Sequence, residues 1–527
     1  MKPFAALLDA LIFMPSRNGK LRLMTEYFAT TPDPDRGYAL AALTGDLSFR
    51  TAKPALLRQL VADRVDPELF ALSYDFVGDL AETAALIWPQ RPTNRDWPHL
   101  AEVVEGLNGA GRTEVPTLLA GWLDSLDATG RWALLKLITG GLRVGVSARL
   151  AKTAVAAIGG QDVAEVEEVW HGLTLPYEPL FAWVEGREDR PNVAAGAGFR
   201  PLMLANPLEE RDADSLDIAL YRAEWKWDGI RVQMAAKGGE RRIYSRTGDD
   251  ISGAFPDLLE AMAFDAVVDG ELLVLRESEV APFNDLQQRL NRKSVTAKML
   301  RDYPAHVRLY DLLFEEGEDL RPLSFDARRL RLEQWHARTS PLRTDLSPLI
   351  PVTDMDALRQ MRSGARDQSI EGLMLKRADS PYLAGRPKGP WFKWKRDPLT
   401  LDVVLMYAQR GHGKRSSFYS DYTFGVWREE AAGGSALVPV GKAYSGFTDE
   451  ELLRIDKWVR AHTTNRFGPV REVEPGLVFE VAFDSAHPSP RHKSGYALRF
   501  PRIHRIRWDK PIEEADGIEA VRGLLAV

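Results

Sequence analysis

The sequence predicts a multidomain protein with an all-α N-terminal domain, an α+β middle domain and an all-β C-terminal domain. Its 527 residues are too many for one hydrophobic core and indicate about three or four domains. Apolar residues recur at helical spacing up to about residue 190, at mixed spacing from about 200 to 400, and mostly at strand spacing after 400. These changes of period place the predicted domains at 1–190, 199–398 and 399–527.

The N-terminal region is expected to form one helix after another, broken at Pro and Gly clusters. In residues 1–14, Phe4, Leu8 and Leu11 fall on one helical face and no small-residue cleavage site follows. We therefore expect a core helix there rather than a signal peptide. Residues 191–198 contain Gly, Ala and Asn and are expected to be a linker.

The middle region mixes strand-like and helix-like segments. Residues 219–227 and 230–236 are strand-like, and because Asp228-Gly229 joins them, we expect a β-hairpin. Two further strands are expected at 242–246 and 266–275, and a helix is expected between them at 255–263.

The C-terminal region has about five short strand-like runs separated by Gly, Ser and Asp turns. One clear helix is expected, at 449–462. A few short strands with one helix are what a small OB-type barrel requires. The expected strands are 401–408, 422–427, 436–440, 477–483 and 504–508.

Composition excludes several kinds of chemistry. The chain has no cysteine, so disulfides, thiolate zinc sites, iron–sulfur clusters and cysteine nucleophiles are excluded, and any metal must be held by oxygen or imidazole. No apolar run approaches the length of a membrane span, so we expect a cytoplasmic protein. The net charge of −6 is uneven: residues 129–161 hold five Lys/Arg and no acidic residue, and residues 491–510 hold seven Lys/Arg against Asp509. We expect local basic surfaces in both segments.

Lys226-Trp227-Asp228-Gly229 is the most informative feature of the chain. A lysine on a strand edge beside an Asp-Gly turn can serve as a covalent nucleophile toward phosphorus. The pattern Lys-x-Asp-Gly alone occurs by chance in roughly one chain in ten. Its weight therefore depends on the segments that follow it.

Two later segments place a carboxylate beside glycine in an apolar strand: Glu271 after Gly270, and Glu371 before Gly372. A buried carboxylate needs a partner, which a divalent cation, a ribose hydroxyl or a buried ion pair would supply. Tyr310 adds an aromatic ring that either stacks on a purine or packs in the core.

A group of cations completes the pattern. Lys393 and Lys395 share one face of a strand, because side chains alternate with a period of two. Two adjacent ammonium groups repel each other unless an anion lies between them, and phosphate fits that position. We expect these lysines and a carboxylate-held Mg²⁺ to lower the pKa of Lys226 and keep it reactive. Arg246, at a strand end, is placed to clamp a phosphate or a ribose.

In this order the segments resemble the motifs of the covalent nucleotidyltransferase superfamily, and specifically of ATP-dependent DNA ligases. The series ends with Arg499-Phe500-Pro501-Arg502 and Arg507-Trp508-Asp509-Lys510. Residues 135–146 are similar to the helical DNA-binding domain that precedes the catalytic core in cellular and many bacterial members. The resemblance implies a helical DNA-binding domain, an ATP-grasp-like α+β nucleotidyltransferase (ligase) domain and a C-terminal OB-fold.

The resemblance also implies a role for each matched residue. Lys226 is expected to accept AMP, Glu224 to read adenine and Tyr310 to stack on it. Further roles fall to groups of residues: ribose and phosphate to Arg231 and Arg246, ribose and metal to Glu271 and Glu371, the α-phosphate to Lys393 and Lys395, and the departing pyrophosphate to Arg499, Arg502, Arg507, Asp509 and Lys510.

The chain departs from the family pattern near Trp391. The arginine often found four residues before this tryptophan is replaced by Pro387, which Arg386 and Lys388 flank. Either side chain can substitute, and Arg386 is our candidate. Tyr310 stands where many relatives have Phe, which preserves the stacking ring.

The activity implied is the sealing of 3′-hydroxyl/5′-phosphate nicks in duplex DNA through a lysyl-AMP intermediate, in DNA repair, by a monomeric, nucleoid-associated enzyme. ATP and Mg²⁺, or Mn²⁺, are the implied cofactors. RNA ligases and GTP-using capping enzymes share the Lys-x-Asp-Gly core, but the helical N-terminal module argues against both. NAD-dependent ligases carry a four-cysteine zinc site that this chain lacks. A DNA-binding clamp without activity is a further alternative, against which the intact Lys226, Glu271, Glu371, Lys393 and Lys395 argue.

Overall fold

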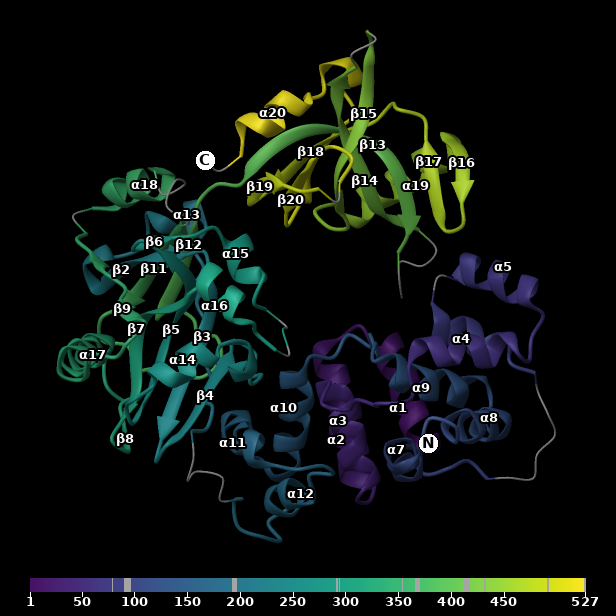
Figure 1. Cartoon of the computed structure of the whole chain (residues 1–527), viewed down its shortest axis with the longest axis horizontal. Helices are drawn as coiled ribbons and strands as arrows, with labels where there is room; N and C mark the ends of the chain where they lie inside the picture. The colour runs from purple at the N-terminus through teal and green to yellow at the C-terminus, as the bar shows by residue number, and fades with distance from the viewer. Residues whose placement is uncertain are drawn as a thin grey trace. The chain divides into compact units, whose positions relative to one another are not determined.

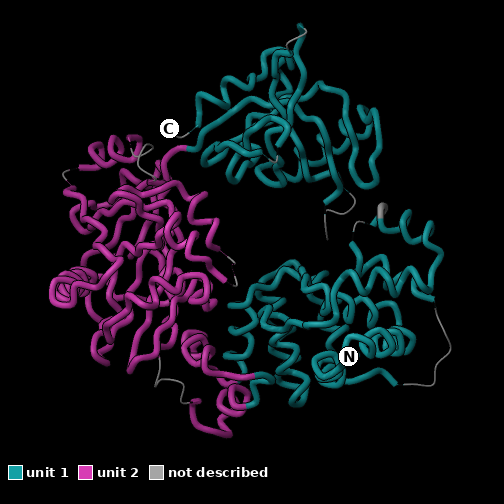
Figure 2. The backbone as a smooth tube through the Cα atoms, viewed as in Figure 1, with its two compact units in different colours: residues 1–158, 175–178, 398–527 teal, residues 159–174, 179–397 magenta. Residues whose placement is uncertain are grey.

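The chain folds into two compact units, which Figure 2 distinguishes. A computed structural model describes residues 1–77, 79–89, 96–191, 197–290, 292, 294–352, 354–364, 370–411, 418–430, 433–490 and 492–525. One unit comprises residues 1–158, 175–178 and 398–527, and the other comprises residues 159–174 and 179–397. Residues 192–196 of the expected linker lie outside the described residues, and the division into three domains stays a prediction.

The N-terminal region is helical (Figure 1). The first helix, α1, buries Phe4, Leu8 and Leu11, so the predicted core helix is confirmed. Helix α9 begins at the Asp127 cap, whose side chain accepts from the Gly130 N–H, and ends at Gly140. The helices are α1 (Lys2–Phe13), α2 (Arg17–Thr30), α3 (Asp35–Thr44), α4 (Pro54–Ala62), α5 (Pro67–Val77), α6 (Leu80–Ile87), α7 (Leu100–Gly109), α8 (Val115–Ser125), α9 (Ala128–Thr139), α10 (Ala148–Gly159), α11 (Val163–Val169), the short η1 (Trp170–Gly172) and α12 (Glu178–Val184).

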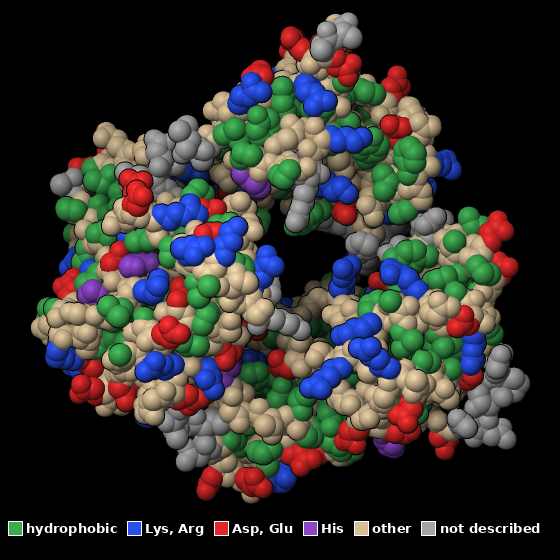
Figure 3. Space-filling view, viewed as in Figure 1, with side chains coloured by type: hydrophobic (Ala, Val, Ile, Leu, Met, Phe, Trp, Pro, Cys, Tyr) green, Lys and Arg blue, Asp and Glu red, His purple; other side chains and the backbone are tan. Residues whose placement is uncertain are grey.

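The prediction of a basic surface along residues 129–161 is wrong for three of its five cations. Arg131, Lys136 and Lys152 are only 3%, 4% and 9% exposed. Lys136 pairs with Asp79 at 2.7 Å, and the Arg131 guanidinium donates to backbone carbonyls. The sequence segment shows the charges but not the acidic and carbonyl partners that neighbouring helices supply. Other Lys and Arg side chains do lie on the visible surface of this region (Figure 3).

The middle region is built on two β-sheets. One has the strand order β1-β12-β11-β2-β10, and the other the order β4-β3-β5-β7-β8, with β6 added on β5 and β9 on β7. The strands are β1 (Asn206–Pro207), β2 (Tyr221–Trp227), β3 (Ile230–Lys237), β4 (Glu240–Ser245), β5 (Ala266–Arg276), β6 (Glu279–Val280), β7 (Ala305–Glu315), β8 (Glu318–Asp319), β9 (Thr344–Leu346), β10 (Leu349–Ile350), β11 (Ile370–Arg377) and β12 (Trp391–Lys395).

Strands β2 and β3 both form as expected, but the predicted hairpin between them is wrong. Within the described residues β2 pairs with β10 and β11, whereas β3 pairs with β4 and β5. The Asp228-Gly229 turn instead carries the chain from one sheet to the other. A Cβ on Gly229 would meet the carbonyl oxygen of Leu272 on β5 at 2.5 Å, so only glycine permits this close approach.

Helices cover these sheets and close two apolar cores. Side chains from β3, β5 and β7 pack with Leu258 of α14 and Trp335 of α17, and the β2 and β11 core includes Leu358 of α18. The predicted helix at 255–263 is confirmed as α14. The helices are α13 (Glu210–Ala213), η2 (Ile218–Leu220), η3 (Ser252–Ala254), α14 (Pro256–Ala261), α15 (Phe283–Gln287), α16 (Ala297–Asp302), α17 (Phe325–Thr339) and α18 (Met355–Gly364).

The C-terminal region is rich in β-structure, and its five predicted strands and one helix are confirmed as β13, β14, β15, β18, β21 and α19. Thr448 and Glu451 form a capping box that begins α19. Strands β16, β17, β19 and β20 were not expected from the sequence. The elements are β13 (Leu399–Arg410), β14 (Tyr419–Glu429), β15 (Ser435–Ala443), α19 (Asp449–Ala461), β16 (Thr463–Phe467), β17 (Val470–Val473), β18 (Val478–Phe483), β19 (Ser485–Pro488), β20 (Tyr496–Arg499), β21 (Arg502–Arg507), η6 (Ile512–Glu514) and α20 (Ile518–Gly523). Among the described residues, no helix combines the length and apolar character needed to cross a membrane.

Candidate active site

A cavity of about 390 Å³ opens between the two sheets of the middle region. This volume suits a small ligand. Both sheets contribute to its wall, because β2 leads directly into β3 across the change of sheet. The predicted site residues that line it are Glu224, Lys226, Arg231, Arg246, Glu271, Tyr310, Glu371, Lys393 and Lys395.

A β-bulge brings Glu371 to Lys226. The pairing of β11 with β2 shifts register between Ile370 and Gly372, so that Gly372 pairs with Lys226 and Glu371 is the extra residue. The Lys226 ammonium donates to Glu371 Oε2. Gly372 has a φ of +143°, and a Cβ there would meet the Trp394 carbonyl oxygen at 2.2 Å. The glycine after the carboxylate is therefore required by the geometry that aims the carboxylate.

The charges around Lys226 differ from the expected pattern. Burial acts to lower the pKa of Lys226, but the negative charges of Glu371 and Glu271 outweigh it, and the pKa is raised above its usual value. The carboxylates outweigh the nearby lysines, so the lowering expected from Lys393, Lys395 and a bound Mg²⁺ together stays a prediction. At Lys393, burial and then nearby cations, Arg386 first, lower the pKa.

Glu271 faces the same cavity from the other sheet. On β5 it pairs with Arg231 of β3 and with Arg308 of β7 in the register of the strands. Burial raises the pKa of Glu271 to about 8, Lys226 opposes the rise and Glu371 adds to it. Two carboxylates thus converge on one lysine, and burial favours the protonated form of Glu271.

The part of the cavity wall that β2, β7 and β11 form contains an ion pair between Glu224 and Lys376. The motifs in the sequence identified Glu224 but not Lys376. Glu224, 1% exposed, lies 2.7 Å from the ammonium of Lys376, which is also 1% exposed. The Lys376 ammonium lies 4.4 Å from the centre of the Tyr310 ring and 4.7 Å from that of Trp391. Lys376 could have been noticed as the first charged residue after the apolar run 373–375.

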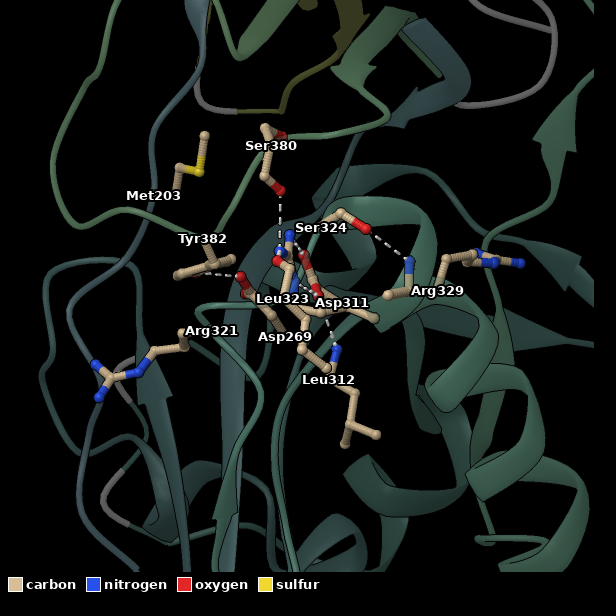
Figure 4. A network of polar contacts seen from close by, with 12 residues as sticks. Met203, Asp269, Asp311, Leu312, Arg321, Leu323, Ser324, Arg329, Ser380 and Tyr382 are labelled. Carbon is tan, nitrogen blue, oxygen red and sulfur yellow. Dashed lines mark hydrogen bonds and ion pairs between the residues drawn. The ribbon is translucent and has the colours of Figure 1, made fainter.

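Arg231 belongs to a buried polar network as well as to the cavity wall. Its guanidinium donates to Asp269 through Nε at 3.1 Å, to the Met203 carbonyl at 2.7 Å and to the Tyr382 hydroxyl at 3.0 Å. Tyr382 in turn donates to Asp269 at 2.7 Å, a contact visible in Figure 4. These bonds fix the guanidinium, so its expected contact with ribose or phosphate stays a prediction.

A second buried ion pair involves Asp311, which is labelled in Figure 4. Arg328 donates to both carboxylate oxygens of Asp311 at 2.8 and 3.0 Å, and both side chains are fully buried. Asp311 directly follows Tyr310, so this pair holds the strand that carries the ring.

Arg386 is exposed, and its charge helps to lower the pKa of Lys393 on the cavity wall, whereas Lys388 is not among the largest causes of that shift. Arg386 is therefore better placed than Lys388 to replace the arginine missing at Pro387. That replacement stays a prediction.

The C-terminal predicted residues belong to the other unit, where Arg502, Arg507, Asp509 and Lys510 form ion pairs of their own. Arg502 lies 3.4 Å from Asp484, Arg507 lies 3.0 Å from Asp509, and Lys510 lies 2.6 Å from Asp402. Arg499 lies on β20, with its guanidinium 5.1 Å from the Phe500 ring centre.

Among the described residues, no group of three or more Asp, Glu or His side chains could hold a metal ion. Glu271 and Glu371 nevertheless both line the cavity, and Glu371 is close enough to raise the pKa of Glu271. Mg²⁺ is commonly held by one or two carboxylates, waters and substrate phosphates, so the two residues fit such an ion.

Comparisons with known proteins agree on one family. The model of the ATP dependent DNA ligase domain matches residues 202–395, and that of the ATP dependent DNA ligase C terminal region matches residues 415–510. A protein of Koribacter versatilis (strain Ellin345), named Probable DNA ligase, is 39% identical over 412 residues, or 73% of this chain and 70% of the relative. DNA ligase 1 of Korarchaeum cryptofilum (strain OPF8) is 29% identical over 99% of this chain and 97% of its own length. The solved structure titled Pmar-Lig_PreS3 shares the fold, with a TM-score of 0.58 and 17% identity, over 96% of this chain and 99% of that one.

Proposed function

The chain belongs to the ATP-dependent DNA ligases, and from this premise we propose that it seals 3′-hydroxyl/5′-phosphate nicks in duplex DNA through AMP held on Lys226. One observation carries the proposal: Lys226, Glu371, Lys393 and Lys395 line a single cavity. A nucleophilic amine, a proton acceptor and two phosphate-binding cations are the groups that this chemistry needs.

In the first step, Lys226 attacks the α-phosphorus of ATP. A nitrogen–phosphorus bond forms, the bond from that phosphorus to the bridging oxygen breaks, and the electron pair leaves with pyrophosphate. The lysine must first lose a proton. Glu371, which already accepts a hydrogen bond from Lys226, is the nearest acceptor for it.

The phosphates supply the anion that the cations of the cavity require. Lys393 and Lys395 project from β12 into the cavity, and Arg246 and Arg386 add positive charge close to Lys393. A bound Mg²⁺, or Mn²⁺, would neutralise part of the triphosphate charge. Glu271 and Glu371 would hold it, and Glu271 would also reach the ribose.

Adenine is the base that best fits the part of the cavity wall that contains the Glu224–Lys376 pair. Its exocyclic amine is a hydrogen-bond donor and its N1 an acceptor, which complements a carboxylate beside an ammonium. Glu224 and Lys376 offer this pair 2.7 Å apart, and Tyr310 lies beside them to stack on the ring. Guanine presents the opposite pattern, so we expect ATP to be preferred over GTP.

The later steps transfer AMP to the 5′-phosphate at a nick and close the strand by attack of the 3′-hydroxyl, releasing AMP. We propose a helical DNA-binding domain at 1–190, a nucleotidyltransferase domain at 199–398 and an OB-fold at 399–527. In this arrangement Arg499, Arg502, Arg507, Asp509 and Lys510 orient the pyrophosphate. The enzyme would act as a monomer on nicked double-stranded DNA.

The first test is covalent labelling of the purified protein with Mg²⁺ and α-labelled ATP, GTP or NAD. We expect far more label from ATP than from GTP or NAD. This label should be stable to alkali and released by acid or by hydroxylamine, as the nitrogen–phosphorus bond of a lysyl phosphoramidate is. Lys226→Ala abolishes it, and Lys237→Ala, which removes an exposed lysine on β3, leaves it unchanged. Label retained by Lys226→Ala, or label from GTP alone, contradicts the proposal.

The second test separates the substrates. We expect sealing of a nick in duplex DNA and little sealing of the same nick in RNA. A protein that takes label from ATP but seals only RNA would be an RNA ligase, and one that binds nicked DNA without any label would be a clamp.

A third test addresses the base. Lys376→Met keeps the length of the side chain and removes its charge, and we expect it to reduce labelling by ATP far more than labelling by GTP. Equal losses with both nucleotides would mean that Lys376 supports the fold of the wall rather than reading the base.

A further inference from the structure

Two cations in the C-terminal region share one carboxylate. Lys510 Nζ lies 2.6 Å from Asp402 Oδ2, and Arg507 Nη1 lies 3.5 Å from the same oxygen. Arg507 also donates to Asp509 through Nε at 3.1 Å and Nη2 at 3.0 Å. Asp402 therefore links two of the side chains that the proposed function assigns to the pyrophosphate.

Asp402 itself is held on rigid structure. It lies on β13, where it pairs with Glu480 of β18. Its backbone N–H donates to the Asp516 carboxylate at 2.7 Å, and its carbonyl accepts from the Asp516 N–H at 2.8 Å. Its side chain is only 14% exposed, so the carboxylate has little room to move.

The two cations depend on this anchor to different degrees. Arg507 has a second carboxylate, Asp509, two positions along the chain, but Asp509 is an exposed partner with 64% of its side chain accessible. Lys510 carries its ammonium on a flexible four-carbon stem, which a fixed partner restrains. An ammonium has three N–H donors, so one bond to Asp402 leaves two for phosphate oxygens.

We propose that Asp402 is a positioning residue that holds Lys510 and Arg507 in the orientation in which they engage the pyrophosphate. The inference rests on the proposed function. It assigns to Asp402 no contact with ATP. Its effect comes from side chains oriented before the substrate arrives, so that their ordering does not add to the barrier of the first step.

The expected effect is confined to that step. Asp402→Ala frees Lys510 and lowers the rate of lysyl-AMP formation roughly ten- to a hundredfold, as a displaced catalytic group does. The loss falls on kcat, and the KM for ATP does not rise, because removing a negative charge does not weaken attraction of the nucleotide. Asp402→Asn keeps the shape and an acceptor oxygen and recovers much of the rate.

The experiment is rapid-quench labelling of the full-length protein with α-labelled ATP, alongside sealing of a nick that already carries AMP on its 5′-phosphate. Sealing of the adenylylated nick releases AMP and involves no pyrophosphate, so both Asp402 variants should perform it at the wild-type rate. Glu519→Gln is the matched control, since it breaks an exposed pair with Arg522 in the same unit. Thermal unfolding of each variant reports the fold.

Slow labelling by Asp402→Ala, recovery in Asp402→Asn and normal sealing of the adenylylated nick would support the proposal. Equal losses in both reactions, or a lowered melting temperature in both variants, would mean that Asp402 is structural and would overturn it. Faster labelling by Asp402→Ala would overturn it too, because Asp402 would then compete with the nucleotide for Lys510. Failure of the proposed function is a separate result, because the wild-type protein would then take no label.

Discussion

Glu371→Gln is expected to make Lys226 less basic in the absence of nucleotide. In the structure burial favours the neutral lysine, but Glu371 and Glu271 overcome burial and raise the pKa of Lys226. Glutamine keeps the size of the side chain and removes the strongest of these charges. Burial then prevails, and the pKa falls.

The size of the effect follows from the contact. Two unit charges about 4 Å apart at an effective dielectric constant near 20 attract each other by about 4 kcal/mol. The side chains of Lys226 and Glu371 are 23% and 16% exposed, so water screens part of this attraction and about 1–3 kcal/mol remains. Because about 1.4 kcal/mol corresponds to a factor of ten, the neutral fraction of Lys226 at a fixed pH should rise roughly five- to a hundredfold.

The assay is reductive methylation of the lysines with a ¹³C label, followed by NMR titration without nucleotide or metal. Lys226→Arg identifies the resonance, and Glu279→Gln, an exposed carboxylate on β6, is the matched control. An unchanged titration of Lys226 in Glu371→Gln would refute the reasoning. The same variant should still form lysyl-AMP poorly, since it loses both the proton acceptor and a proposed metal ligand.

Three further substitutions test the environment of the cavity. Burial raises the pKa of Glu271 from 4.5 to about 8, so the stability that its protonated form contributes is fully present below pH 4.5 and is lost as the pH rises through 8. Between these pH values the melting temperature of the wild type should therefore fall relative to that of Glu271→Gln. A constant difference between the two melting temperatures across this range would contradict the prediction. Tyr310→Ala should weaken ATP binding, measured by equilibrium titration, roughly five- to a hundredfold, and Tyr310→Phe should retain it. An unchanged affinity in Tyr310→Ala would mean that the ring belongs only to the core. Arg328→Ala leaves Asp311 buried and unpaired and should lower the free energy of unfolding in urea by about 3–5 kcal/mol, whereas a loss below about 1 kcal/mol would show that water reaches the carboxylate.

Local patterns predicted the elements well, because alternation and helical spacing are properties of short segments. The five C-terminal strands and α1 are examples. The hairpin at Asp228-Gly229 failed because strand partners are chosen by the whole fold. Strand β2 pairs with β11, and the two side chains that meet there, Lys226 and Glu371, are 145 residues apart in sequence.

The members of the site were also predictable, but their electrostatics were not. The nine predicted residues that line the cavity were found from motifs, whereas Lys376, the first charged residue after the apolar run 373–375, was overlooked. The sequence contains the charges around Lys226 but not their distances. The bulge at Glu371 decides that a carboxylate, rather than Lys393 or Lys395, sits in contact with the nucleophile.

Because Arg131, Lys136 and Lys152 are buried, the affinity of this chain for DNA should depend less on salt concentration than its sequence suggests. Each phosphate neutralised on duplex DNA contributes about −0.9 to the slope of log affinity against log salt. Cations that are buried inside the helical region do not contact DNA phosphates and so release no counterions from DNA. From residues 129–161 only Arg143 and Arg149 remain to contribute, so this segment should account for a slope of no more than about −2 rather than the −4 to −5 that five cations would give.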